Sequence, residues 1–132
     1  MRGKLTSIQW PGIVNTSGGC EWVVEAHGCD PRALSEITAL QDLFAQIIRD
    51  LDLHPVGDAA WHKFPEPGGG ITGVTMLRES HLACHTFPEY RSMCLNLFCC
   101  RPRNAWDFEE HLKLYLGAVS VNVRRIDRPY CA

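Results

Sequence analysis

Between Ala59 and Cys100, segments that are typical of β-strands follow one another with only short links between them. They are AAWHKF (59–64), ITGVTMLRE (71–79), HLACHTF (81–87) and SMCLNLFCC (92–100), all rich in β-branched, aromatic or other apolar residues. A parallel connection needs a crossover of about a dozen residues, and several of these links are shorter than that. The sheet is therefore predicted to be mainly antiparallel.

Two other segments have the periodicity of amphipathic helices. The first begins after Asp30-Pro31, a favourable helix start, and its apolar residues recur at steps of three and four. They are Leu34, Ile37, Leu40, Phe44, Ile47, Ile48 and Leu51. This pattern predicts a helix of about five turns that lies on the sheet. A second helix is predicted from Asn104 up to a stop at Gly117.

One strand before the first helix (21–27) and one after the second (119–126) bring the count to five or six strands against two helices. Two helices can cover only one face of such a sheet, and a second copy of the chain is the simplest cover for the other. We therefore predict an α+β fold: a two-layer α/β sandwich with a mainly antiparallel sheet and two helices on one face, which dimerises through the sheet side. Residues 1–19, which end in Gly18-Gly19, are expected to be a flexible arm before a single domain, 20–132.

Composition excludes several classes of partner. The chain has 132 residues, enough for one domain, and a formal net charge of −2 with no basic stretch, so nucleic acid is not expected. No apolar run approaches the roughly 20 residues that a membrane span needs.

The seven cysteines are an odd number, and polar residues such as Gln9 interrupt any export signal. We therefore expect reduced thiols in a cytoplasmic protein.

The strand SMCLNLFCC separates two kinds of side chain by alternation. Met93, Leu95, Leu97 and Cys99 fall on one face, which is uniformly apolar and suits the core. Cys94, Asn96, Phe98 and Cys100 fall on the other, mixed face. Because strand ends open onto loops and solvent, Cys100 is the thiol that we expect to take part in chemistry.

Metal binding and serine hydrolysis are weak interpretations of this region. Side chains of the kind that bind zinc are present at His81, Cys84, His85, Cys99 and Cys100. Adjacent cysteines on a strand point to opposite faces, however, and no CxxC or HxxxH pair lies on a helix where it could anchor a tetrahedral ion, so no metal is expected. Ser80 and His85 could act as nucleophile and base, but no nucleophile elbow surrounds the serine.

The neighbourhood of Ser80 carries a longer pattern. Its pieces are His62-Lys63-Phe64, Thr72-Gly73-Val74, Glu79-Ser80-His81, His85-Thr86-Phe87-Pro88-Glu89 and Phe98-Cys99-Cys100. With this order and spacing the chain resembles the bacterial S-adenosylmethionine decarboxylase family, from about Glu21 to Tyr130. The block from Glu79 to Glu89 is the most specific part of the resemblance.

The resemblance implies a proenzyme that makes its own prosthetic group. Ser80 Oγ would attack the carbonyl of Glu79, and elimination would then split the chain into residues 1–79 and 80–132. The second fragment would carry a pyruvoyl group made from Ser80. The resemblance also implies that Thr72 supports the processing reaction and that His85 is its proton acceptor. The second role suits an imidazole near neutral pH.

The resemblance also implies a reaction and a substrate. The substrate amine would form a Schiff base with the pyruvoyl group, which takes up electrons as carbon dioxide leaves, and Cys100 would return a proton. Phe64 and Phe87 match the aromatic residues that hold an adenine, and Glu89 matches the residue that meets the ribose. The product, decarboxylated S-adenosylmethionine, serves spermidine and polyamine synthesis.

Some positions depart from the family pattern. Phe87 replaces the usual tryptophan, Cys84 a β-branched residue, Cys99 a threonine and Arg101 a glycine. Because some relatives decarboxylate arginine or ornithine with the same group, that activity is the alternative. Two other classes stay open at this point: an intact, non-catalytic binding subunit and a small zinc module.

Overall fold

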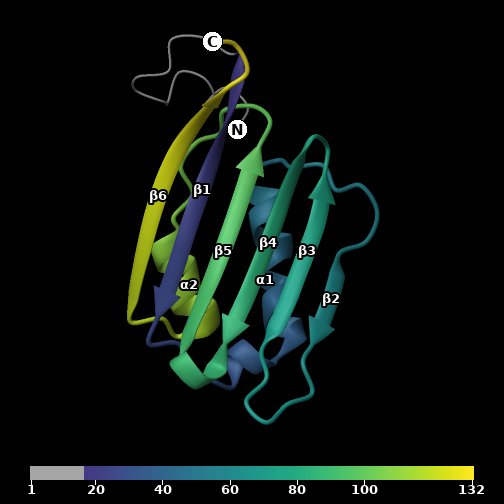
Figure 1. Ribbon diagram of the computed structural model, residues 1–132. Helices are drawn as coiled ribbons and strands as arrows, with labels where there is room; N and C mark the ends of the chain where they lie inside the picture. The colour runs from purple at the N-terminus through teal and green to yellow at the C-terminus, as the bar shows by residue number, and fades with distance from the viewer. Residues whose placement is uncertain (1–16) are drawn as a thin grey trace.

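The computed structural model describes residues 17–132, which form one six-stranded sheet in the order β2-β3-β4-β5-β1-β6 (Figure 1). Every neighbouring pair of strands is antiparallel, as the short links predicted. The strands are β1 (Gly18–His27), β2 (Ala60–Lys63), β3 (Ile71–Leu77), β4 (Ser80–Phe87), β5 (Ser92–Cys99) and β6 (Ser120–Pro129).

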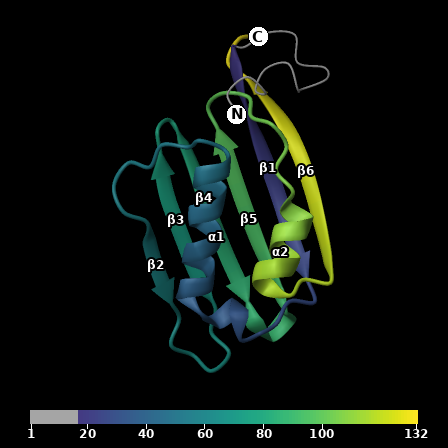
Figure 2. The same cartoon turned by 180° about the vertical axis from the view of Figure 1, so that it is seen from behind.

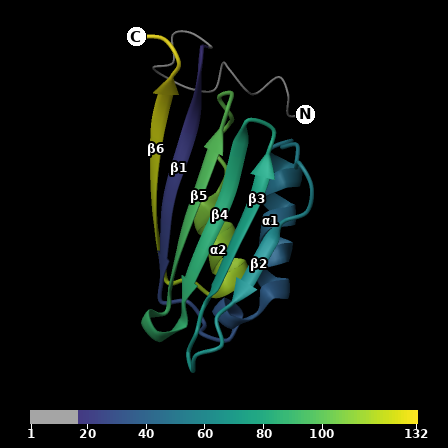
Figure 3. The same cartoon turned by 45° about the vertical axis from the view of Figure 1, so that its right-hand side comes forward.

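Two α-helices, α1 (Ile37–Asp50) and α2 (Phe108–Leu116), lie side by side on one face of this sheet (Figure 2). The view in Figure 3 shows them as a second layer behind the strands. Two 3₁₀ helices, η3 (Ala33–Ser35) and η4 (Pro88–Tyr90), lie in the connections. The predicted two-layer sandwich with both helices on one face is confirmed. None of the helices in residues 17–132 has the length and apolar character to cross a membrane.

The core lies between the helices and the sheet. On β5 the side chains of Met93, Leu95, Leu97 and Cys99 are at most 2% exposed, which confirms the predicted core face of that strand. The apolar stripe of α1, which consists of Leu40, Leu43, Phe44 and Ile47, packs against it. Each such side chain contributes roughly 1.5–3 kcal/mol when it is fully buried. Burial of this face therefore fixes the register of every strand that carries a site residue.

Strand β1 begins at Gly18, earlier than the predicted start at Glu21, so Gly18 and Gly19 belong to the sheet and not to the expected arm. A Cβ atom at Gly19 would lie 2.1 Å from the carbonyl oxygen of Cys99, so only glycine allows the two strands to approach so closely. The prediction was wrong because paired glycines are more common in turns than in strands. The rest of the expected arm, residues 1–16, lies outside the described residues.

Helix α1 begins later than predicted. Asp30 accepts a hydrogen bond from the backbone N–H of Arg32 at 3.0 Å, which makes a turn and not a helix cap. Leu34 is buried within η3, and α1 itself begins at Ile37. The periodic apolar pattern therefore continues through two separate helical segments, η3 and α1. The spacing of apolar residues does not show the break between them, so it predicted one helix.

Helix α2 begins at Phe108 and not at Asn104. Asp107 is its N-cap and accepts a hydrogen bond from the N–H of Glu110 at 3.0 Å, which is worth about 1 kcal/mol. Gly117 ends the helix as predicted, with a φ of 68°. Asparagine and aspartate are both good caps, and the sequence offers both within a few residues.

The second face of the sheet is open and carries both charge and exposed apolar side chains. Arg124 pairs with Glu25 and Arg128 pairs with Glu21 across β1 and β6. On the same face, toward the β2 edge of the sheet, Met76 of β3 is 61% exposed. This is the face through which dimerisation is predicted.

Candidate active site

Glu79 and Ser80 lie at the tight turn between β3 and β4, at the upper end of the sheet in Figure 1. Leu77 pairs with Ser80, so only Arg78 and Glu79 form the turn. Glu79 has a φ of 53°, in the left-handed region that residues other than glycine and asparagine rarely adopt. Such a conformation costs about 1 kcal/mol. The backbone is therefore strained at the residue whose peptide bond is predicted to break.

Cys100 approaches this turn from the end of β5. Its backbone N–H donates a hydrogen bond to Ser80 Oγ at 2.8 Å, and its thiol donates to the carbonyl oxygen of Arg78 at 3.5 Å. The Tyr130 hydroxyl donates to the carbonyl oxygen of Cys100 at 2.7 Å. Desolvation and the neighbouring Cys100 and Glu79 raise the pKa of Tyr130, so its hydroxyl stays protonated and able to donate. Ser80 and the predicted proton donor, Cys100, are thus in direct contact.

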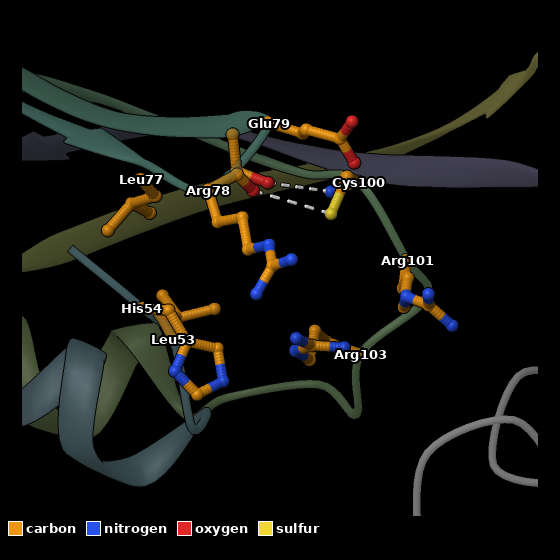
Figure 4. A pocket seen from close by; sticks show the side chains of 9 residues that line it. Leu53, His54, Leu77, Arg78, Glu79, Cys100, Arg101 and Arg103 are labelled. Atoms are coloured by element: carbon orange, nitrogen blue, oxygen red, sulfur yellow. Dashed lines mark hydrogen bonds between the residues drawn. The ribbon is translucent and has the colours of Figure 1, made fainter. Parts of the chain in front are cut away.

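Glu79, Ser80 and Cys100 line a cavity of about 460 Å³ (Figure 4). The remaining lining residues are Leu53, His54, Leu77, Arg78, Arg101 and Arg103. The side chains of Arg78 and Arg103 point into the space between them, whereas Arg101 points away from it. The cavity is therefore open enough for a small molecule and is strongly basic.

Cys99 and Cys100 have opposite environments although they are adjacent. Cys99 is buried on the helix side and lies in register with Cys20 of β1. Its hydrogen bond with Cys20 and its burial raise the pKa of Cys99, which keeps this thiol protonated. Cys100 lines the cavity instead. Of the two, only Cys100 is placed to exchange a proton with a bound molecule.

A second group of predicted residues lies at the opposite end of the sheet. Thr72 and His85 are paired in register on β3 and β4, and Thr72 Oγ1 is hydrogen-bonded to His85 Nδ1 at 2.9 Å. A cavity of about 500 Å³ lies beside them. It is lined by this pair together with Phe64, Phe87, Glu89 and the Gly68–Gly70 turn. The three predicted substrate-binding residues therefore share one cavity with the predicted processing pair.

The two groups are far apart within one chain. Ser80 is the first residue of β4 and His85 lies five positions further along it, which corresponds to about 17 Å in a strand. The imidazole of His85 therefore does not reach Ser80 of the same chain. The structure brings together Glu79, Ser80 and Cys100 at one end and Thr72, His85, Phe64, Phe87 and Glu89 at the other.

The side chains that could bind zinc are divided between the faces of the sheet. Cys84 and Cys99 are buried on the helix side, and burial raises the pKa of Cys84 to about 12. His81 and His85 are exposed on the open face. Within residues 17–132 no three side chains of histidine, cysteine, aspartate or glutamate come together as a metal site.

The site also contains three residues that were not predicted from the sequence: Tyr130, Arg78 and Arg103. Tyr130 lies 30 positions after Cys100 and meets it only because β6 pairs with β1. Arg103 enters the cavity from the irregular segment between β5 and α2. Only the two arginines that follow Cys100, Arg101 and Arg103, could have suggested a charged cavity.

Comparison with known proteins gives one consistent result. A sequence model of the family described as S-adenosylmethionine decarboxylase matches residues 20–129 of this chain. The S-adenosylmethionine decarboxylase proenzyme of Caldanaerobacter subterraneus subsp. tengcongensis is 30% identical over 107 residues, which cover 80% of this chain and 84% of that protein. The proenzyme of the same name from Clostridium kluyveri is 33% identical over 110 residues, which cover 80% and 82%.

A solved structure is similar as well. The crystal structure of the adenosylmethionine decarboxylase from Aquifex aeolicus matches with a TM-score of 0.71 and 16% sequence identity. The match covers 89% of this chain and 96% of that chain. At this level of identity the match shows that the two chains share a fold.

Proposed function

The chain belongs to the S-adenosylmethionine decarboxylase family, and on that premise we propose that it is a self-cleaving carboxy-lyase that decarboxylates S-adenosylmethionine. Cleavage between Glu79 and Ser80 gives fragments 1–79 and 80–132, and each fragment contributes three strands to the sheet. The hydrogen bond from the Cys100 N–H to Ser80 Oγ, beside the strained Glu79, is the observation that supports this most directly.

The surroundings of Ser80 fit a pyruvoyl group formed at that position. Ser80 lies at the end of a strand, beside a cavity of about 460 Å³ that leaves room for a substrate. When present, the pyruvoyl carbonyl takes up the electron pair that is released as carbon dioxide leaves. The chain's own residues fix the serine, orient the substrate and supply the proton.

Cys100 is the residue that we assign to proton delivery. Its thiol lies at the same cavity as Ser80 and is held by the carbonyl oxygen of Arg78 at 3.5 Å. A thiol held in this way can give a proton to the carbon that has lost its carboxyl group. The buried Cys99 is not available for this role, because it faces the core.

We further propose that a homodimer completes each site. Thr72 and His85 lie on the open face, at the opposite end of the sheet from Ser80. A two-fold axis that runs across the strands, between two facing sheets, places the Ser80 end of one copy against the His85 end of the other. His85 of the partner subunit then acts as the base for Ser80, and the cavity of Phe64, Phe87 and Glu89 supplies the adenosine site. The exposed apolar side chains of this face support such contact.

All seven cysteines are free thiols, which supports a reducing compartment such as the cytoplasm. The substrate is a small molecule, and the product would feed the synthesis of spermidine.

Intact mass spectrometry of the purified protein tests the proposal. We expect two chains that meet at the Glu79–Ser80 bond, and a phenylhydrazine adduct on the shorter fragment only. Ser80→Ala is expected to stay full-length and inactive, while Ser120→Ala, an exposed serine on β6, is expected to cleave normally. Release of carbon dioxide from carboxyl-labelled S-adenosylmethionine, with arginine and ornithine as controls, tests the substrate. A single full-length chain without adduct would exclude the proposed function.

A further inference from the structure

The cavity at the cleavage turn holds an excess of positive charge. Arg78, Arg101 and Arg103 line it, and Glu79 is the one acidic residue among its lining residues. The guanidinium groups of Arg78 and Arg103 face each other across the space, while the carboxylate of Glu79 points away from it (Figure 4). Two cations thus converge on a space that contains no anion from the lining side chains.

Neither of these two arginines forms an ion pair with another residue in the part of the chain that the structure describes. Arg124, Arg125 and Arg128 on β6 each pair with an acidic side chain instead. The Nε atom of Arg103 is buried and has no hydrogen-bond partner among residues 17–132. A buried donor without a partner commonly lowers the stability of the folded state by about 1–3 kcal/mol. Arg103 therefore keeps a donor that is available to an anion.

Self-cleavage, on which this inference rests, produces an anion at this place. Ser80 Oγ attacks the carbonyl carbon of Glu79 and the peptide C–N bond breaks, which leaves an ester and a free amino group on Ser80. A base then removes the Cα proton of Ser80, its electron pair forms a Cα–Cβ double bond, and the Cβ–Oγ bond breaks. The leaving group is the α-carboxylate of Glu79, which carries the negative charge away. Water then replaces the amino group, which leaves as ammonia, so the sequence needs neither oxidant nor reductant.

We propose that Arg78 and Arg103 stabilise the α-carboxylate of Glu79 as it leaves Ser80, and hold it in the cavity after cleavage. Guanidinium groups form strong, charge-assisted hydrogen bonds with carboxylates, often through two donors at once. A charge that is stabilised as it develops lowers the barrier of the step that creates it. The full charge of the carboxylate develops during the elimination, so this is the step on which we expect the two arginines to act.

A hydroxylamine trap separates the two steps, because hydroxylamine cleaves the ester but not the peptide bond. Freshly synthesised chain is sampled over time, with and without hydroxylamine, and its species are counted by intact mass. In Arg78→Gln/Arg103→Gln we expect cleavage to slow by about a hundredfold to a thousandfold, as for the loss of an oxyanion donor elsewhere. We also expect the ester, absent or minor in the natural chain, to accumulate as hydroxylamine-sensitive full-length material. Arg78→Lys/Arg103→Lys keeps both charges and is expected to recover most of the rate.

Arg49→Gln is the matched control, since it removes the charge of an exposed arginine on α1 that does not line the cavity. It is expected to cleave at the natural rate. Cleavage of the double glutamine variant at the natural rate would overturn the inference, as would full-length material that resists hydroxylamine, because the block would then precede the ester. If the double glutamine variant is insoluble, the double lysine variant is compared with Arg78→Gln alone. A double lysine variant that cleaves no faster than Arg78→Gln would equally overturn the inference. If the natural chain itself does not split at Glu79–Ser80, the proposed function fails instead.

Discussion

The backbone N–H of Cys100 donates a hydrogen bond of 2.8 Å to Ser80 Oγ, although the two residues lie 20 positions apart. The bond joins the first residue of β4 to the residue that follows β5, where the pairing of these strands ends. The thiol of the same residue lines the cavity beside Ser80. Cys100 therefore has two separable parts: a backbone group that positions the serine and a side chain that is available for catalysis.

This separation predicts that Cys100→Ala cleaves normally but turns over slowly. Alanine keeps the backbone N–H that holds Ser80 Oγ, while the proton donor is lost, so kcat is expected to fall by about 10²–10⁴-fold. Intact mass reports cleavage, and carbon dioxide release reports turnover. Cys131→Ala, which removes an exposed thiol at the C-terminal end, serves as the control and should retain activity. Failure of Cys100→Ala to cleave would assign its thiol to maturation.

The distance between Ser80 and His85 predicts complementation between two inactive chains. Ser80→Ala and His85→Ala are each expected to stay uncleaved when expressed alone. When they are co-expressed, a mixed dimer contains one complete site, formed by Ser80 of one chain and His85 of the partner subunit. Only the His85→Ala chain should then be cut, which intact mass distinguishes. If neither chain is cut in the mixture, His85 does not act across a dimer.

The sequence predicted the layers well because burial follows the pleat of the strands. Met93 to Cys99 alternate between core and open face, and no other register buries the same side chains. The predicted end of the flexible arm at Gly19 was wrong, because the close contact of the Gly19 backbone with Cys99 exists only in the paired sheet. The helix starts failed for a similar reason, since several cap residues compete locally and tertiary packing selects one.

The division of the site into two groups could not be predicted from motif spacing. Glu79-Ser80 and His85-Thr86 form one compact block in the sequence, but a strand carries them apart by about 3.4 Å per residue. Residues from distant segments meet instead: Cys100 reaches Ser80 at the end of β5, and Tyr130 reaches Cys100 through the β1–β6 pairing. The convergence of Arg78 and Arg103 depends in the same way on a loop whose path has no sequence signature.

The left-handed backbone at Glu79 predicts that glycine at this position stabilises the precursor. The effect of Glu79→Gly on the free energy of unfolding is best measured in the uncleavable Ser80→Ala chain, where the turn stays intact. Relief of a φ of 53° is expected to raise the free energy of unfolding by about 1 kcal/mol. Asp52→Gly, which relieves a φ of 54° away from the turn, should stabilise the chain similarly. With Ser80 present, only Glu79→Gly should slow cleavage; an unchanged rate would mean that the strain plays no part in the attack.

The hydrogen bond between Asp50 and Trp106 predicts an acid-dependent contribution to stability. It joins the end of α1 to the segment before α2, with Trp106 Nε1 donating to the carboxylate at 2.9 Å. Burial by itself raises the pKa of Asp50, but the hydrogen bonds from Trp106 and Gln46 outweigh it and lower the pKa below its ordinary value of 3.8. Because the folded chain then binds the proton less tightly than the unfolded chain, the contribution is complete above that value and is lost as the pH falls below it.

Asp50→Asn keeps the shape and one acceptor oxygen of this side chain but removes its charge. In the uncleavable Ser80→Ala chain, we expect the substitution to lower the free energy of unfolding by about 1 kcal/mol at pH 7. The difference should shrink as the pH falls below 3.8, since the aspartate of the parent chain then becomes neutral as well. Urea unfolding across this pH range measures it, with Asp42→Asn on the exposed side of α1 as the control. A difference that persists unchanged into acid would show that the carboxylate charge does not support the contact between α1 and the segment before α2.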